Sequence, residues 1–253
     1  MFWCWMSGGQ LFTWSQLRCL VLCQEFADVK LSVIVPTFNE ESMIVETLRR
    51  AIATLAPHEV IVADACSADG TAKRARPYAN VLALDMTRGA ALNRAATIAT
   101  GDVLLFLHAD TMLPIGASAA IAGALMKEGV IGGAFRLRLA HPGRLAALVA
   151  HNVNLRSALL NTFFGDQALF VRREVFLDAG GFKNWSVMED LEILTRLRRH
   201  GRLALLDSVV VTSARRHEKN GWWSTIGTIW IMTLLHRLGV SGHAMIRWYK
   251  PRR

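Results

Sequence analysis

The stretch SVIVPTFNEE, residues 32–41, decides the fold of this 253-residue chain. Its first half is a run of apolar, mostly β-branched residues, which is typical of a strand that is buried on both faces. The run stops at Pro36, and Asn39, Glu40 and Glu41 follow within a few residues. A buried strand that ends in an acidic loop indicates that these acids line a site.

Strand-like and helix-like patterns then alternate along the chain, which is the signature of a layered α/β fold with a mostly parallel sheet. The hydrophobic content of 52% lets a chain of this length bury the core of one main domain. In chain order, the patterns predict a strand at 31–38, a helix at 40–55, a strand at 59–65, a helix through 74–76, a strand at 81–85, a helix around 89–100 and a strand at 102–110.

Acidic side chains follow three of these strands. In open α/β sheets the ligand crevice lies outside the carboxyl ends of the strands, so we expect Glu40, Asp64, Asp69 and Asp110 to converge there. Carboxylates accept hydrogen bonds from bases and riboses or hold a hard cation, and such a cation bridges a carboxylate to a diphosphate. The chain has neither GxGxxG after its first strand nor GxxxxGK[ST], so a nucleotide must be held in another way.

The net charge of +9 favours an anionic partner such as a nucleic acid, a membrane surface or a phosphorylated small molecule. Nucleic acid is disfavoured because the strands are aliphatic and do not interleave aromatic with basic residues. The four cysteines, Cys4, Cys19, Cys23 and Cys66, show no metal-ligand spacing. We therefore expect a reduced, cytoplasmic environment.

Residues 1–28 are rich in Trp and Cys but lack the basic start of a signal peptide, and their apolar run is interrupted. We expect them to be an extension, with the natural chain beginning at Val29 and a single domain spanning 29–253. The rival interpretation is a membrane-associating leader.

Five motifs carry a resemblance to a known family: SVIVPTFNEE, VIVADACSADGT, RGAALNRAATIATGDVLLFLHADT, GDQALFVRREVFLDAGGF and VMEDLEILTRLRRHG. In this order they resemble a family 2 glycosyltransferase of the GT-A type over about residues 30–245. They also resemble the bacterial branch with an LHADT metal motif, which is associated with radical-SAM and selenoprotein domains. The resemblance implies the GT-A fold and a nucleoside-diphosphate sugar donor, with UDP as the expected nucleotide.

The resemblance also assigns residues to the donor site. Asp64 has a structural alternative, because a strand-end acid can cap the following helix, and Arg88 and Asn93 have one as surface residues. In a C-terminal basic cluster, two residues would clamp the diphosphate, with a solvated basic loop as the alternative. The full set is Pro36, Thr37, Glu40, Asp64, Asp69, Arg88, Asn93, Arg216 and His217.

The metal motif departs from the common DxD pattern, because His108 stands where the first Asp usually does. Asp110 is the expected ligand of a divalent cation, Mn²⁺ or Mg²⁺. His108 is either a second ligand, which would favour Mn²⁺, or a hydrogen-bonded histidine at the strand end.

The resemblance places the catalytic base at Asp190, with Glu189 beside it at the start of an amphipathic helix. An inverting transfer needs one carboxylate to deprotonate the acceptor hydroxyl. Asp166, in the GDQ motif, would orient a hydroxyl of acceptor or sugar. The alternatives are an acidic first helical turn for the pair and a simple turn at Gly165 for Asp166.

The C-terminal tail, residues 220–253, combines an apolar run with Trp222, Trp223 and Trp230 and a basic end. It predicts either an interfacial helix at the inner face of the cell membrane or a core helix that closes the acceptor side. The first interpretation implies a lipid-like acceptor and a peripheral membrane protein.

Two other functions remain open at this point. One is a non-catalytic, nucleotide-binding protein at a membrane surface, built on a degenerate GT-A scaffold. The other is a nucleotidyltransferase, which should carry a Gly-rich basic loop after its first strand, whereas PTFNEE contains neither feature.

Overall fold

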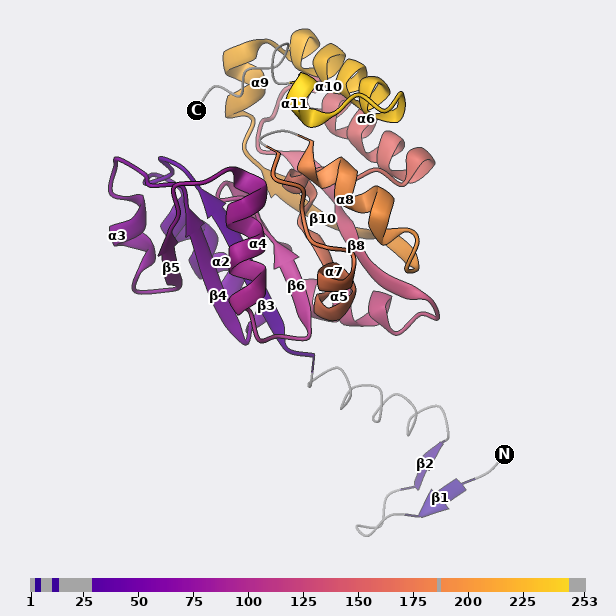
Figure 1. The fold of residues 1–253 in the computed structure, drawn as a ribbon. Coiled ribbons are helices and arrows are strands. Elements are labelled where there is room, and N and C mark those ends of the chain that lie inside the picture. Colours follow the sequence, from indigo (N-terminus) through magenta and orange to yellow (C-terminus); the bar gives the residue numbers. More distant parts are fainter. Residues whose placement is uncertain (1–2, 6–10, 14–28, 186–187, 246–253) are drawn as a thin grey trace.

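The computed structural model of the protein describes residues 3–5, 11–13, 29–185 and 188–245 (Figure 1). Most of the described strands join one sheet in the order β5-β4-β3-β6-β9-β8-β10-β7. Their bounds are β3 Leu31–Thr37, β4 Glu59–Asp64, β5 Asn80–Ala83, β6 Val103–Phe106, β7 Thr111–Met112, β8 Val130–Leu139, β9 Leu169–Arg172 and β10 Arg202–Thr212. A separate antiparallel pair joins β1 (Trp3–Trp5) to β2 (Leu11–Thr13).

The first half of the sheet is parallel, as the alternating sequence pattern predicts. Strands β5, β4, β3 and β6 run in the same direction, and Val33 lies between Val60 of β4 and Leu105 of β6. The second half is mixed, because β9 runs antiparallel to both β6 and β8, while β8 and β10 are parallel. The carboxyl ends of β3, β4 and β6 therefore meet at one edge.

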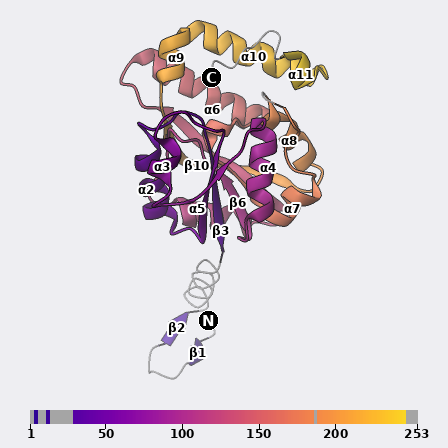
Figure 2. The ribbon, with the colours of Figure 1, turned by 60° about the vertical axis from the view of Figure 1, so that its left-hand side comes forward.

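Helices cover both faces of the sheet (Figures 1 and 2). Helices α2, α5 and α6 pack on one face, and α4, α7 and α8 on the other. Their bounds are α2 Ile44–Leu55, α3 Thr71–Ala75, α4 Arg88–Ile98, α5 Ala117–Leu125, α6 Arg144–Leu160, η1 (a 3₁₀ turn) Gly165–Gln167, α7 Arg173–Asp178, α8 Glu189–Leu197, α9 Arg215–Asn220, α10 Trp222–Arg237 and α11 Gly242–Met245.

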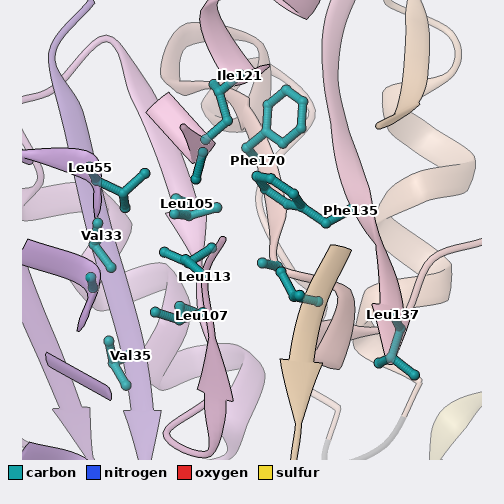
Figure 3. Close-up of a cluster of buried hydrophobic side chains, with 14 of the residues drawn as sticks. Val33, Val35, Leu55, Leu105, Leu107, Leu113, Ile121, Phe135, Leu137 and Phe170 are labelled. Atoms are coloured by element: carbon teal, nitrogen blue, oxygen red, sulfur yellow. The ribbon is translucent and has the colours of Figure 1, made fainter. Parts of the chain in front are cut away.

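The two-residue period of the strands explains why the core has two halves. Val33 and Val35 point into the cluster that includes Leu105 and Phe170 (Figure 3), whereas Ile34 joins the cluster on the opposite face. All five side chains are fully buried. The run SVIV is thus apolar at every position because helices cover both sides of β3.

Two expected elements have different bounds. The helix predicted at 40–55 begins at Ile44, because the Glu40 carbonyl accepts from the amides of Met43 and Ile44 in a preceding turn, at 3.0 Å each. Glu40 and Glu41 therefore lie in the loop rather than in the first helical turn. The strand predicted at 102–110 ends at Phe106, which leaves the rest of its motif in a loop.

The C-terminal helix α10 packs against α6 and α8, and its remaining surface is exposed. It therefore has features of both expected arrangements, the core helix and the surface helix. Throughout the described ranges, no helix combines the length and hydropathy that a membrane span requires.

Candidate active site

The loops after β3 and β4 are joined by hydrogen bonds at the carboxyl edge of the sheet. Thr37 Oγ1 donates to Asp64 Oδ1 at 2.8 Å, and the amide of Ser67 donates to Asp64 Oδ2 at 2.9 Å. The amide of Asn39 donates to Ser67 Oγ at 2.9 Å. Pro36 lies in β3 beside Ala63, directly before Thr37. Three of the predicted donor residues thus lie together, with Asp64 fully buried and held in place by its loop.

Asp69 is held by hydrogen bonds from the loops on either side of it. Its carboxylate accepts from the amides of Thr71 at 2.9 Å and Glu41 at 3.2 Å, and the hydrogen bond from the Thr71 side chain lowers its pKa. These contacts fix the β4–α3 loop against the loop after β3. Asp69 and Glu41 also line an open cavity of about 340 Å³ with Asn39, Ser42 and Arg74.

Asp110 and Glu40 converge on Arg215, at the start of α9. Arg215 Nη2 lies 2.7 Å from Glu40 Oε2 and 3.4 Å from Asp110 Oδ2, and these carboxylates raise its pKa. The predicted meeting of Glu40 with Asp110 is therefore present, and the pair already accepts one cationic group. Arg215 was not among the residues predicted for the site.

The same carboxylates bear on the expected metal. Within residues 29–185 and 188–245, no three His, Cys, Asp or Glu side chains gather to hold a metal by themselves. A Mg²⁺-like cation that keeps several waters and bridges one or two carboxylates to a diphosphate does not need such a cluster. Asp110, a quarter exposed beside Glu40, fits that arrangement.

His108 has a partner other than a metal. Its Nε2 contacts the guanidinium of Arg88, and burial followed by the charges of Arg88 and Arg216 puts its pKa well below the usual value. The ring is therefore neutral, and this contact favours the hydrogen-bonded alternative over the metal-ligand prediction. Arg88 Nε also lies 3.0 Å from Glu189 Oε1, so Arg88 links the loop after β6 to the start of α8.

The two motifs predicted to be catalytic meet at one hydrogen bond. The amide of Gly165 donates to Asp190 Oδ2 at 2.9 Å, and the amide of Leu191 donates to Oδ1 at 2.9 Å. Burial raises the pKa of Asp190 and raises that of Glu189 to about 7. The structure thus holds Asp190 in one orientation as a half-buried and comparatively basic carboxylate.

Asp166 and Arg156 form the interior of this carboxylate cluster. Burial raises the pKa of Asp166 to about 6, against the opposing effect of the charge on Arg156. Asp166 Oδ1 is buried and has no hydrogen-bond partner in the described structure. Arg156 is 2% exposed, stacks 4.1 Å from the centre of the Phe164 ring, and is attracted by Asp166 and Asp190.

Sequence reasoning missed Arg156, although a signal was present. In RLAALVAHNVNLRSALL, it stands at helical spacing from Ala146, Val149 and Val153, which form the buried face of α6. A charged residue on an otherwise apolar helical face indicates a buried ionic partner.

The predicted phosphate clamp lies beside the same cluster. Arg216 interacts electrostatically with Asp166, Asp190 and Asp110, and burial lowers its pKa. His217 is buried against Trp222, with ring centres 5.5 Å apart, and burial lowers its pKa as well. The structure therefore brings Arg216 to the carboxylates.

Asn93 is hydrogen-bonded to the loop after α7. Its Nδ2 donates to the Phe182 carbonyl at 2.7 Å, and its Oδ1 accepts from the Phe182 amide at 2.8 Å. This pair fixes the loop after α7, where Gly180 and Gly181 have positive φ and end the helix. The expected role of Asn93 beside the donor gains no support from these contacts.

Comparisons with known proteins bear on the fold and the family of the chain. Glucosyl-3-phosphoglycerate synthase from Mycobacterium tuberculosis, solved with Mn²⁺, UDP and glucosyl-3-phosphoglycerate, is 23% identical, with a TM-score of 0.61 over 94% of this chain and 88% of that one. A second structure of the synthase, with Mn²⁺, UDP-glucose and phosphoglyceric acid, is 25% identical, with a TM-score of 0.61 over 94% and 87% of the two chains. The mannosyltransferase PcManGT from Pyrobaculum calidifontis, solved with GDP-mannose and Mn²⁺, is 24% identical, with a TM-score of 0.56 over 78% and 63%.

These likenesses confirm the GT-A fold that the resemblance implied. No curated protein sequence matches the chain significantly. Residues 32–175 match the domain described as glycosyl transferase family 2, which is more than half of the chain. The chain therefore belongs to glycosyl transferase family 2.

Proposed function

We propose that this protein transfers a sugar from a nucleoside-diphosphate sugar, with UDP as the nucleotide, to an acceptor hydroxyl or carboxyl, with inversion at the anomeric carbon. One observation carries the proposal. Asp190 is held by the Gly165 and Leu191 amides among buried carboxylates, beside Arg216 and the loop that carries Asp110. This arrangement supports Asp190 as the proposed base, next to groups that suit a diphosphate.

The transfer needs one base and a stabilised leaving group. Asp190 takes the proton of the acceptor hydroxyl while the hydroxyl oxygen forms its bond to the anomeric carbon. The bond from that carbon to the diphosphate breaks on the opposite side, and the diphosphate leaves with the electron pair. Arg216, which interacts with Asp166, Asp190 and Asp110, is the proposed clamp for the departing phosphates. A divalent cation at Asp110, Mn²⁺ or Mg²⁺, would neutralise part of the same charge.

The relatives support the donor class. The synthase was solved with UDP-glucose and the mannosyltransferase with GDP-mannose, each with Mn²⁺. A hexose donor is thus the simplest proposal for this chain. Pro36, Thr37 and Asp64 at the β3 and β4 edge are the proposed nucleotide contacts, and Asp166 is the proposed contact to a sugar or acceptor hydroxyl.

Calorimetric titration with UDP and with GDP, each with and without Mn²⁺, tests the donor site. We expect metal-dependent binding of UDP that Asp110→Ala abolishes. His108→Ala separates the two metal predictions, because a residue that only pairs with Arg88 should leave the metal dependence intact. Absence of nucleotide binding by the folded protein would contradict the proposed donor.

Catalysis is tested through Asp190→Asn, which keeps the shape of the side chain but removes its basicity. We expect UDP release from UDP-sugars to fall by about 10²–10⁴-fold while UDP affinity is retained. Asp207→Asn is the matched control, since Asp207 is fully exposed on β10. If Asp190→Asn keeps full activity in an assay that reports the biological function, the non-catalytic alternative is favoured.

The C-terminal helices support a proposal for the acceptor and for the location of the protein in the cell. We propose a lipid-like acceptor and a cytoplasmic protein that binds the inner face of the cell membrane. The support is the exposed aromatic and aliphatic surface of α10 together with the basic residues that follow it. The LHADT motif supports assignment to the bacterial branch associated with radical-SAM and selenoprotein domains.

A further inference from the structure

Helix α6 has an apolar stripe on the side opposite its packed face. Leu145, Leu148, Leu155 and Leu159 are 42%, 47%, 47% and 73% exposed. Their spacings of three, seven and four residues place them in one line along the helix. Arg156, one residue after Leu155, points instead into the carboxylate cluster. Arg156 thus ties α6 to the active site, while the four leucines beside it are left exposed.

Helix α10 carries a second stripe. Its buried side is formed by Thr225, Met232 and Thr233. The outer side includes Trp223 and Leu238 near its two ends, at 66% and 71% exposed. Between them, Trp230, Ile231 and Leu234 are 40%, 59% and 58% exposed. An exposed apolar surface of this kind marks an interaction site in a natural protein.

The two stripes form one continuous surface, which we call the α6–α10 face. Trp230 Nε1 on α10 donates to Asn152 Oδ1 on α6 at 2.9 Å, and Asn152 lies between Leu148 and Leu155 in the α6 stripe. Both views show α10 lying beside α6 (Figures 1 and 2). The indole nitrogen is therefore satisfied within the face, and the apolar parts of its neighbours are left uncovered.

The charge around this face is mainly positive, although Glu218 of α9 lies 3.7 Å from His141, just before α6. The sequence contains no Asp or Glu in residues 139–165 or 219–253. Arg144, Arg198 and Arg237 are exposed at the ends of α6, α8 and α10. Arg198 and Arg237 both line a small cavity of about 40 Å³, and the charge of Arg237 adds to burial in lowering the pKa of Arg198. Arg198 and Arg237 thus lie close together at the edge of the face, and neither forms an ion pair with an acidic side chain among the described residues.

We propose that the α6–α10 face docks on the surface of an anionic lipid bilayer, with its Leu and Trp side chains among the acyl chains and its arginines at the lipid phosphates. An interfacial helix pair with an apolar stripe and a largely cationic border has the chemistry that such a surface binds. A second copy of the chain fits less well, because pairing the face with itself opposes arginines without supplying carboxylates.

The docking surface also bears on where the enzyme would meet its acceptor. Only this consequence rests on the proposed function. Arg156 follows Leu155 by one residue and precedes Leu159 by three, so it borders the leucine stripe, and the carboxylate cluster lies within about one helix diameter, roughly 10 Å, of the bilayer surface. A lipid-like acceptor whose reactive head projects from the membrane would meet the site at that depth.

Co-sedimentation of the full chain with vesicles tests the surface directly. The vesicles are made of phosphatidylcholine alone or with phosphatidylglycerol, and the variants are Leu159→Glu and Leu234→Glu, one on each stripe. We expect binding of the wild type to the anionic vesicles and an affinity at least tenfold lower for each variant. Ile115→Glu is the matched control, because Ile115 is 86% exposed and lies outside the face.

Arg198→Gln combined with Arg237→Gln tests the rim, and we expect weaker binding with a smaller dependence on salt. UDP titration and circular dichroism of each variant show that it is folded, and they keep this test independent of sugar transfer. Wild-type binding by Leu159→Glu and Leu234→Glu, or no preference for anionic vesicles, would overturn the proposal. If the wild type instead forms a dimer that these variants dissociate, and it does not bind vesicles, then a second copy of the chain covers the face.

Discussion

Replacing Asp166 with Asn should stabilise the protein at neutral pH, although Asp166 is a proposed contact to the substrate. The buried carboxylate has one oxygen without a hydrogen-bond partner in the described structure, and burial outweighs the attraction of Arg156. Its pKa is thereby raised from an ordinary 3.8 to about 6. An amide at this position carries no charge, so it avoids the cost of burying one.

The sign and size of the effect follow from proton linkage. Because the pKa is raised on folding, the folded chain holds a proton between about pH 4 and 6 that the unfolded chain has lost, so stability falls as pH rises through that window. A shift of about two units corresponds to about 3 kcal/mol at 1.36 kcal/mol per unit. The gain in the free energy of unfolding for Asp166→Asn should therefore approach 3 kcal/mol near pH 7.5 and vanish near pH 4.

Urea unfolding of the wild type and of Asp166→Asn near pH 4.5 and pH 7.5 measures the effect. At neutral pH, the expected gain corresponds to a rise in Tm of about 6–12 °C for a chain of this size. The exposed Asp207→Asn serves as a control that should change stability little at either pH. An Asp166→Asn variant that is destabilised near pH 7.5, or whose effect is the same at both pH values, would refute the reasoning.

Three further outcomes follow from single contacts. Arg156→Met should move the acidic limb of the pH–rate profile upward by about one unit, because the pKa values of Asp166 and Asp190 rise when the neighbouring positive charge is lost; an unchanged limb would contradict this. Gly165→Ala should lower UDP release by about 10²-fold with UDP affinity retained, since a Cβ there clashes with His108 Nε2 and shifts the amide that holds Asp190. Asn93→Ala should lower the free energy of unfolding in urea by about 1–3 kcal/mol, because both main-chain groups of Phe182 lose their partner; a neutral variant would exclude that role.

The sequence predicted the structure best where the pattern of apolar residues depends on a single strand or helix. The unbroken apolar run at 33–35 predicted a strand covered on both faces, and β3 is the central strand of the parallel half. The helix that starts at Glu189 was likewise visible from its apolar spacing. Ends of elements were less predictable, as at 102–110, because pairing with β9 stops at Phe106 although Leu107 after it is apolar.

The sequence predicted which residues lie near one another better than it predicted their partners. The strand-end rule brought Glu40 and Asp110 to one edge, because parallel strands share it, and the family resemblance added Thr37, which pairs with Asp64. The partner of His108 and the partner of Asn93 were not visible. Each of these contacts joins segments that are 20 or more residues apart, and no local pattern encodes them.

The sequence by itself determined the α/β class, the acidic edge and the family, because strand and helix periodicities and ordered motifs are local properties of the chain. Only the tertiary structure decided that the Gly165 amide holds Asp190, that Arg156 lies within the carboxylate cluster, and that α6 and α10 share one apolar surface. The physical reason is that pKa values, buried charges and exposed faces depend on which distant segments exclude water from one another. The packing of distant segments sets these pKa values, buried charges and exposed faces, and the order of the residues reveals them only in part.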